Sequence, residues 1–431
     1  MKVYISGISG TGMGPLALFA ANAGIEVMGS DLAKGAIYDE LMRAGIRVKI
    51  GAQDGEFLKS EIDGLNWFVH TSALSENHPE LMAVREAGVK ISKRDDFTAY
   101  LVDKLGLKMV AVAGTHGKTT TTAMIIWACL KLGLPVSYVV GTTLGFAVSG
   151  AYHDGDKYFV YEADEYDRNF LKYHPWLAVI PSVSYDHPDI YPTVSDYEAA
   201  FLQFKSQSEM VIENTANGIV GGEVMFLPED FKLAGEARRI DAAMAANAVM
   251  RMLRLEHNDG LAVDDKKTEV IRILNEFPGV GRRFEKLADG LYTDYAHHPE
   301  EIVATIEMAR EQAKIDGKKG VVVVYEPHQN ARQIEVKDGY REAFVGADKI
   351  FWLPTYLVRE PEGVPILSAE ELAGGLVNEE DVCLAWLSRG LAITIREELA
   401  AGNLVLLMTA GPADAWMRRL AAGESVDELA H

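Results

Sequence analysis

The sequence has 431 residues, of which 24% are charged and 48% hydrophobic, and this length and balance predict a globular protein of about three domains. Its 42 basic and 63 acidic side chains give a formal net charge of −21, which makes nucleic acid and anionic membrane surfaces poor partners. The two cysteines and the lack of a long apolar stretch predict no disulfide framework, no signal peptide and no membrane span. We therefore expect a cytoplasmic enzyme.

The first quarter of the chain alternates between strand-like and helix-like segments. Residues 1–24 predict a strand, a glycine-rich turn and a helix, and residues 25–28 predict a second strand. Further strands are expected at 67–73 and 89–92. Because strands and helices alternate with short connections, the pattern predicts a doubly wound parallel sheet, and we expect this α/β domain to cover 1–107.

The rest of the chain predicts two more α/β domains. A strand at 109–113 leads into a second glycine-rich turn and a helix that ends near Gly133. This domain is expected over 108–278, and a third over 279–431. The third domain is expected to contain a helix at 300–313 and strands at 290–296, 319–327, 349–354 and 403–410.

The turn after the strand at 109–113 has the sequence AGTHGKTT and indicates a nucleotide site. Its glycines allow backbone N–H groups to surround phosphate, and the N-terminus of the following helix favours negative charge. Lys118 is expected to reach the β- and γ-phosphates, and the hydroxyl of Thr119 to bind Mg²⁺. Val112 stands where the usual pattern has its first glycine, so a plain glycine turn with a solvated lysine is the alternative.

Acidic side chains and a histidine follow two other expected strands. Glu162 directly follows the strand-like run 158–161 and begins the sequence EADEYD. A carboxylate at the end of a buried strand, beside a phosphate loop, suits Mg²⁺, although an acidic run alone is more often a solvated turn. His187 follows the apolar run 177–184, where either a metal or phosphate contact or a structural role fits.

The glycines of the N-terminal turn indicate a second diphosphate site. Gly7, Gly10, Gly12 and Gly14 do not form the strict dinucleotide-binding pattern, but Asp31 lies about where a ribose-binding acid is expected. The pattern favours a diphosphate at a helix N-terminus. From these residues alone, an NAD site and a UDP-sugar site both remain open.

Two segments of the third domain also carry candidate site residues. Arg283, in the sequence GVGRRF, is a candidate for stabilising a transferring phosphoryl group, the alternative being a salt-bridged arginine pair. The loop 326–332 follows the strand-like run VVVVY. Because loops at strand ends line ligand crevices in α/β sheets, this loop is a candidate for binding a second substrate.

At these residues the chain resembles the Mur ligase family. The matching segments occur in the family's order: GISGTGMGPLA, GTHGKTTTT, EADEYD, DHPDIY, GVGRRF, DYAHHP and EPHQNAR. The resemblance implies a Rossmann-like N-terminal domain that binds a UDP substrate, a central P-loop ATPase domain and a Rossmann-like C-terminal domain that binds the acceptor. It also implies a monomer or homodimer that uses ATP and Mg²⁺ in peptidoglycan precursor synthesis.

The implied reaction joins L-alanine to the lactyl carboxylate of UDP-N-acetylmuramate through an acyl phosphate. For catalysis the resemblance implies Lys118, Glu162, His187 and Arg283. For ATP it implies Gly114, Thr115, His116, Gly117, Lys118, Thr119, Thr120, Arg283 and Asp294, and for the metal Thr119, Glu162 and His187. For the UDP substrate it implies Gly10, Thr11, Gly12, Asp31 and Ser72, and for the acceptor His297, His328 and Arg332.

Several positions depart from the family's pattern. The usual His-Asn and following Asn, which contact adenine or phosphate, are replaced in the stretch 235–241, and Ser182 stands where an Asn is expected. Gln329 replaces an arginine that is typical of alanine-adding members, whereas Glu326 and Asn330 are similar to a murein-tripeptide-recycling ligase. The acceptor is therefore open between L-alanine and a tripeptide.

Two other classes of protein are weighed against the ligase. An NAD-dependent oxidoreductase is suggested only by the N-terminal glycines and Asp31, and it leaves the GKTT loop unexplained. A non-catalytic nucleotide-binding homologue is suggested by the replaced His and Asn positions.

Overall fold

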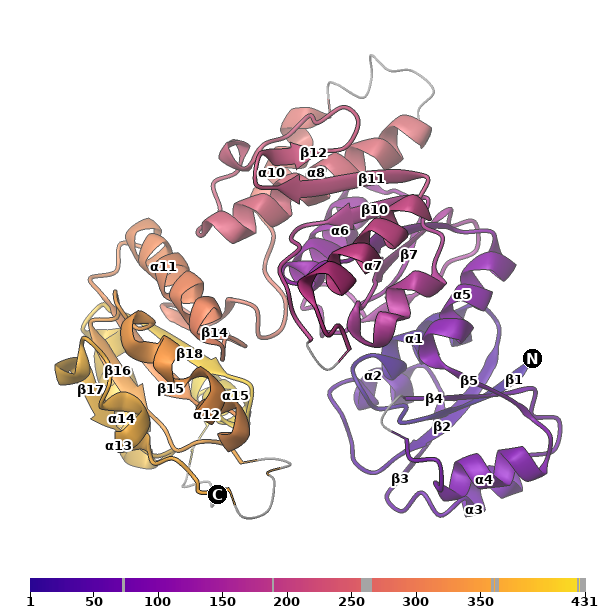
Figure 1. Cartoon of the computed structure of the whole chain (residues 1–431), viewed down its shortest axis with the longest axis horizontal. Helices are drawn as coiled ribbons and strands as arrows, with labels where there is room; N and C mark the ends of the chain where they lie inside the picture. The colour runs from indigo at the N-terminus through magenta and orange to yellow at the C-terminus, as the bar shows by residue number, and fades with distance from the viewer. Residues whose placement is uncertain are drawn as a thin grey trace. The chain divides into compact units, whose positions relative to one another are not determined.

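The computed structural model describes residues 1–71, 74–187, 190–256, 266–357, 360, 364–424 and 426. Within these residues the chain forms three β-sheets with helices on their faces, which confirms the predicted α/β class (Figure 1). The chain divides into two compact units, Met1–Lys232 with Arg239–Phe277, and Leu233–Arg238 with Pro278–His431. The first unit contains two of the sheets and the second unit contains the third.

The first sheet is parallel throughout and has the order β3-β2-β1-β4-β5. Its strands are β1 (Lys2–Ser6), β2 (Glu26–Asp31), β3 (Arg47–Ile50), β4 (Trp67–His70) and β5 (Lys90–Lys93). Its helices are α1 (Met13–Asn22), α2 (Tyr38–Arg43), α3 (Glu56–Ser60), α4 (Pro79–Glu86) and α5 (Arg94–Leu105). Because β1 is central, the glycine-rich turn that follows it opens at the carboxyl edge of the sheet, where ligands bind in open α/β sheets.

The second sheet has the order β12-β11-β10-β6-β9-β7-β8, with antiparallel pairing only at its two edges. Its strands are β6 (Lys108–Val112), β7 (Val136–Val139), β8 (Gly150–Ala151), β9 (Tyr158–Glu162), β10 (Leu177–Ile180), β11 (Met210–Thr215) and β12 (Gly218–Val220). Helices and turns follow as α6 (Lys118–Leu132), η1 (Tyr166–Lys172), α7 (Val194–Ser206), η2 (Pro228–Asp230), α8 (Glu236–Glu256) and α10 (Lys267–Asn275). Because β6 lies between β10 and β9, the loops after these three strands meet at one edge.

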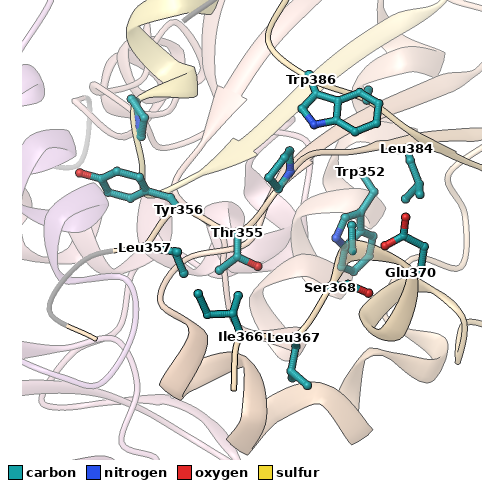
Figure 2. Close-up of a pocket in the computed structure, with 14 residues that line it drawn as sticks. Trp352, Thr355, Tyr356, Leu357, Ile366, Leu367, Ser368, Glu370, Leu384 and Trp386 are labelled. Atoms are coloured by element: carbon teal, nitrogen blue, oxygen red, sulfur yellow. The ribbon is translucent and has the colours of Figure 1, made fainter. Parts of the chain in front are cut away.

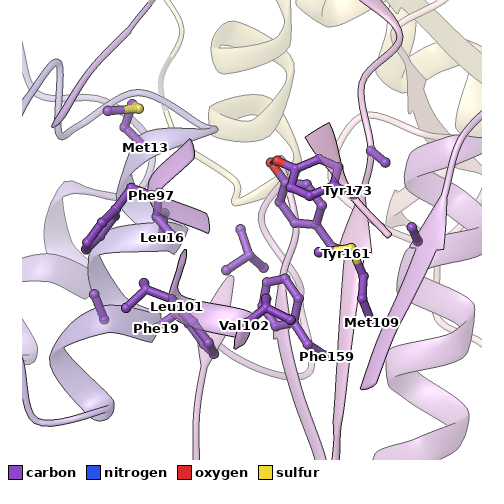
Figure 3. Packing of buried hydrophobic residues seen from close by; sticks show 14 of the residues in the cluster. Met13, Leu16, Phe19, Phe97, Leu101, Val102, Met109, Phe159, Tyr161 and Tyr173 are labelled. Atoms are coloured by element: carbon purple, nitrogen blue, oxygen red, sulfur yellow. The ribbon is translucent and has the colours of Figure 1, made fainter. Parts of the chain in front are cut away.

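One continuous apolar core joins these two sheets. Side chains of α1, α5 and β9 meet in it, as Figure 3 shows, and the rings of Phe19 and Phe159 lie 4.8 Å apart. Trp67 of β4 packs against Phe97 of α5 at 5.1 Å between ring centres. Protein interiors are closely packed and hold neighbouring elements in fixed positions, so this core fixes the N-terminal glycine turn relative to the loop after β6.

The third sheet has the order β13-β14-β18-β15-β16-β17, and only the edge strand β13 is antiparallel. Its strands are β13 (Glu285–Ala288), β14 (Leu291–Asp294), β15 (Val321–Glu326), β16 (Lys349–Trp352), β17 (Val382–Leu384) and β18 (Leu404–Thr409). Its helices and turns are α11 (Pro299–Ile315), α12 (Asn330–Val336), η3 (Lys337–Glu342), α13 (Ala369–Ala373), η4 (Glu379–Asp381), α14 (Arg389–Ala400) and α15 (Ala413–Ala421).

Both faces of this third sheet are buried. Val321 and Val323 pack into a core with α11, whereas Val322 and Val324 pack into a second core with α14 and α15. A parallel sheet covered on both faces explains why its strands are nearly continuous apolar runs in the sequence. No helix in the described part of the chain is long and apolar enough to cross a membrane.

Candidate active site

The predicted phosphate loop is the turn between β6 and α6, and it has the expected order of strand, glycine-rich turn and helix. Gly114 and Gly117 have φ angles of +148° and +83°, which side chains other than glycine rarely allow. A Cβ added at Gly114 would lie 2.6 Å from the carbonyl oxygen of Ser182. The amide of Thr115 donates to that carbonyl at 3.0 Å. The glycines are therefore required because the loop packs directly on the backbone after β10.

Ser182, which replaces the asparagine of the family pattern, holds the phosphate loop through its side chain. Its Oγ accepts from the amide of His116 at 2.8 Å and donates to the carbonyl oxygen of His116 at 3.0 Å. Ser184 contacts the same loop through its backbone, because its carbonyl oxygen accepts from Thr115 Oγ1 at 2.6 Å. The serine that replaces the family's asparagine therefore fixes the shape of the phosphate loop.

We expect Ser182→Ala to raise the KM for ATP about tenfold with a smaller change in kcat, because two hydrogen bonds to the loop are lost. Steady-state kinetics with varied ATP measures this effect. Ser184→Ala is the matched control, since it keeps the backbone contacts to Thr115 and is expected to leave the KM unchanged. Equal KM values for the two variants would contradict the role given to the Ser182 hydroxyl.

The amine of Lys118 is held at the loop by three acceptors. Its Nζ donates to the carbonyl oxygens of Gly114 and Thr115 at 2.5 and 3.2 Å, and to Glu165 Oε1 at 2.9 Å. Glu165 is fully buried, and His187 Nε2 lies 3.6 Å from its Oε1. The neighbouring carboxylate of Glu165 raises the pKa of His187 above its usual value. The structure thus places Lys118 and His187 around a carboxylate that the sequence analysis did not single out.

Thr119 and Glu162 form a second pair at the same edge. Thr119 Oγ1, in the first turn of α6 together with Thr120, donates to Glu162 Oε1 at 2.8 Å. A hydroxyl and a carboxylate oxygen are ligands that Mg²⁺ accepts, and Mg²⁺ takes its remaining ligands from phosphates and water. Among the described residues, no group of three or more His, Cys, Asp or Glu side chains could hold a metal ion, so a Mg²⁺ here would depend on the phosphates and water for most of its ligands. His187 lies against Glu165, and its predicted contact with the metal stays a prediction.

The stretch that replaces the family's His and Asn residues also reaches the phosphate loop. Asp241 of α8 is buried, and its Oδ1 accepts from Thr121 Oγ1 of α6 at 3.0 Å. This contact holds the N-terminal part of α6, so the replaced stretch keeps a polar contact to the helix that follows the phosphate loop.

A cavity of about 210 Å³ joins the phosphate loop to the N-terminal glycine turn within the first unit. It is lined by Thr11, Gly12, Arg94, Lys118, Val139, Gly141, Tyr161, Glu162 and Asp164. Burial raises the pKa of the Asp164 carboxyl. Two turns that the sequence assigns to different ligands therefore open into one space, and Arg94, which sequence reasoning missed, lines it as well.

The N-terminal turn is braced by the acid predicted to bind ribose. Asp31, at the end of β2, accepts from the amide of Ser9 through Oδ2 at 2.8 Å. Gly12 is the residue before α1, so the turn Gly10–Gly12 leads directly into the helix. Ser72, predicted to belong to this site, lies outside the described residues. The carboxylate of Asp31 shapes the turn, and its contact with a ribose stays a prediction.

In the second unit, Asp294 and Arg283 lie at the carboxyl end of β14. The two carboxylate oxygens of Asp294 accept from the amides of Phe284 and Ala296, both at 2.7 Å, and burial raises its pKa. The guanidinium of Arg283 lies 5.2 Å from the ring centre of Tyr295. Asp294 therefore ties two loops together, and a contact of either residue with ATP stays a prediction.

The three residues predicted to bind the acceptor come together in the second unit. The rings of His297 and His328 lie 6.1 Å apart in an edge-to-face arrangement. Burial, together with the charges of His297 and Arg332, lowers the pKa of His328 to about 4, and burial also lowers that of His297. Burial therefore favours the uncharged form of both imidazoles, which lie near the arginine.

Glu326 and Asn330, the residues similar to a tripeptide-recycling ligase, have partners inside the second unit. Glu326 is buried at the end of β15 and accepts from the hydroxyl of Thr409. Asn330 donates to the carbonyl oxygen of Pro365 at 3.0 Å and accepts from the amide of Leu367 at 2.8 Å. These contacts give both side chains a structural role.

A larger, mostly apolar cavity of about 670 Å³ lies at the carboxyl ends of β16 and β17. Trp352, Ile366 and Trp386 surround it, as Figure 2 shows, and Tyr356 connects it to the acceptor loop through the amide of Gln329, which donates to the carbonyl oxygen of Tyr356 at 2.9 Å. Glu370 is the one charged side chain among the described residues that line it.

Comparisons with known proteins agree with this geometry. Residues 2–104 match the family model "Mur ligase family, catalytic domain", and residues 112–219 match "Mur ligase middle domain". The UDP-N-acetylmuramate–L-alanine ligase of Kineococcus radiotolerans is 32% identical over 95% of this chain and 93% of its own length. That of Symbiobacterium thermophilum is 30% identical over 100% of this chain and 95% of its own length.

Solved structures show the same fold. The crystal structure of the UDP-N-acetylmuramate–alanine ligase from Thermotoga maritima has a TM-score of 0.74, with 21% identity over 98% of this chain and 99% of that chain. A murein peptide ligase from Psychrobacter arcticus has a TM-score of 0.56, with 21% identity over 99% of both chains.

Proposed function

The chain belongs to the Mur ligase family, and we propose that it uses ATP to join L-alanine to the lactyl carboxylate of UDP-N-acetylmuramate, a step of peptidoglycan precursor synthesis. One observation carries the proposal: the cavity that Gly12 of the N-terminal turn shares with Lys118 and Glu162 of the ATP side. Such a space is needed because the substrate carboxylate and the γ-phosphate of ATP must meet.

In the proposed reaction a carboxylate oxygen attacks the γ-phosphorus, and the bond from that phosphorus to the bridging oxygen of ADP breaks. The amine of L-alanine then attacks the acyl carbon, phosphate leaves, and the amine loses a proton as the amide forms. Phosphoryl transfer depends on positioning and on cations rather than on covalent help from the protein. Lys118 supplies a cation at the β- and γ-phosphates, and the backbone amides of Gly114–Thr120 hold them.

Thr119 and Glu162 are the residues that would hold Mg²⁺, which, when bound, neutralises charge on the phosphate oxygens. His187 supports this group through Glu165, which also holds Lys118. Arg283 and Asp294 are also proposed to bind ATP. The domain division proposed with these roles is 1–107 for the UDP substrate, 108–278 for ATP and 279–431 for the acceptor.

The remaining residues are assigned to the two other substrates. Gly10, Thr11, Gly12, Asp31 and Ser72 are proposed to bind the UDP substrate. Arg332 is proposed to pair with the carboxylate of L-alanine, because a guanidinium matches a carboxylate in geometry and charge. The neutral rings of His297 and His328 would accept from the amino group without adding a repelling charge. A cytoplasmic location is part of the proposal and is supported by the two free cysteines, Cys129 and Cys383.

We expect phosphate release from ATP with Mg²⁺, UDP-N-acetylmuramate and L-alanine, and little with glycine, L-serine or the recycling tripeptide. A coupled phosphate assay with each acceptor tests this expectation. Release with the tripeptide alone would keep the ligase chemistry but assign the chain to salvage of cell-wall peptides. If no acceptor gives phosphate release, the result would contradict the proposal and favour a nucleotide-binding protein without turnover.

A further inference from the structure

Arg94 is a cation at the edge of the shared cavity whose side chain is 25% exposed, and the proposed reaction assigns no role to it. It is the first residue of α5, directly after β5, and its side chain lines the cavity together with Gly12 and Lys118. The amine of Lys118 is already held by the phosphate loop and Glu165. Arg94 is therefore the cation that serves the end of the cavity formed by the N-terminal turn.

The guanidinium of Arg94 is held in place by Asp95. Arg94 Nε and Nη2 both lie 3.2 Å from Asp95 Oδ1. Asp95 is buried and also accepts from the hydroxyls of Tyr173 at 2.9 Å and Tyr161 at 3.2 Å. Because Tyr161 belongs to β9 and Tyr173 follows η1, these bonds fix the arginine of the first sheet relative to the second sheet. Such a fixed guanidinium loses little entropy on binding a ligand.

The third nitrogen of the guanidinium, Nη1, lies against the N-terminal glycine turn. A Cβ added at Gly12 would lie only 2.5 Å from it. Gly12 is the residue directly before α1, so Nη1 and the N-terminal amides of α1 share one location. A fixed cation beside a helix N-terminus in a cavity is a site for an anion. The whole chain has a charge of −21, so an anion needs such a local cation.

We propose that Arg94 binds the diphosphate of the UDP substrate at the Gly12 turn and so places the rest of the substrate in the cavity toward Lys118. This inference rests on the proposed function for the identity of the substrate. The carboxylates of Glu162, the last residue of β9, and of Asp164, two residues later, also line the cavity. Their negative charge faces the same space, so a diphosphate bound there needs the positive charge of Arg94.

Binding of UDP-N-acetylmuramate, measured by calorimetry without ATP, tests the proposal. We expect Arg94→Ala to weaken binding about 10- to 100-fold and Arg94→Lys to weaken it less, because charge-assisted hydrogen bonds to phosphate are lost. The KM for ATP is expected to change less than about twofold. Lys93→Ala is the matched control, since Lys93 is the neighbouring cation but is exposed and paired with Asp167 at 2.6 Å.

A second variant tests the contact between the guanidinium and the turn. Gly12 has a φ of −90°, which alanine adopts without strain, so the added methyl of Gly12→Ala would displace only the end of the Arg94 side chain. Gly12→Ala is expected to weaken binding in the native chain but to add little in the Arg94→Ala background. This loss of additivity is a signature that general damage to the fold would not produce.

The outcomes distinguish the proposed function from the role given to Arg94. A native chain that binds UDP-N-acetylmuramate without releasing phosphate overturns the proposed function but leaves the role of Arg94 to be judged by the variants. Unchanged affinity in Arg94→Ala, or a fall in kcat alone, overturns the role given to Arg94. A native chain that does not bind UDP-N-acetylmuramate overturns both. If the Arg94 variants have the same melting temperature as the native chain, misfolding is excluded as the cause of weaker binding.

Discussion

Replacing Lys118 with alanine is expected to lower the rate of phosphate release by about a thousandfold or more. The amine of Lys118 is held at the mouth of the phosphate loop by two loop carbonyls and Glu165, so its charge is fixed before the reaction begins. A preorganised cation of this kind stabilises the charge that develops during phosphoryl transfer. A phosphate assay at saturating substrates measures the loss.

The same variant is expected to bind UDP-N-acetylmuramate nearly as well as the native chain. The reason is that the proposed diphosphate site uses Gly12 and Arg94, and neither of them bonds to Lys118. Lys131→Ala is the matched control, because Lys131 lies exposed in the last turn of the same helix. Loss of substrate binding together with turnover in Lys118→Ala would contradict the assignment of the two substrates to separate turns.

The phosphate loop could be predicted from the sequence because it is a local structure. Strand, glycine turn, Lys118 and helix follow one another directly, and the physics of a helix N-terminus needs no distant partner. The partners of this loop could not be predicted in the same way. Glu165 lies 47 residues after Lys118, and Arg94 reaches Gly12 from the start of another helix. Only the order of strands in the two sheets brings these side chains together.

Residues that the sequence marks as ligands can also be used internally. Asp31 stands at the position expected of a ribose-binding acid, yet in the structure it accepts from the amide of Ser9. Asp294 likewise bonds two backbone amides, and Asn330 bonds the backbone near Leu367. A carboxylate at a strand end satisfies the exposed amides of the next turn as readily as those of a ligand, and residue type and spacing do not separate these two uses.

Replacing Glu80 with alanine is expected to destabilise the first unit more than any other single substitution considered above. Glu80 is buried beneath the first sheet and accepts from the hydroxyls of Tyr4 and Ser30 at 2.6 Å each and of Ser6 at 2.7 Å. The carboxylate thereby ties β1 and β2 to α4. Its removal leaves three buried hydroxyls without their acceptor, which costs about 3–5 kcal/mol. We expect the melting temperature in calorimetry to fall by about 10 °C.

The control for this prediction is Glu86→Ala, at the exposed end of the same helix, which is expected to change the melting temperature by about one degree. The mechanism is tested by removing the hydroxyls as well. Gln53 belongs to the same cluster, because its Nε2 donates to Ser30 Oγ at 2.8 Å. Since an apolar replacement of all partners leaves no group of the cluster unsatisfied, Glu80→Leu combined with Tyr4→Phe, Ser6→Ala, Ser30→Ala and Gln53→Leu should be more stable than Glu80→Ala alone. A combined variant that is less stable than Glu80→Ala would show that the packing of this cluster, rather than its hydrogen bonds, holds α4 to the sheet.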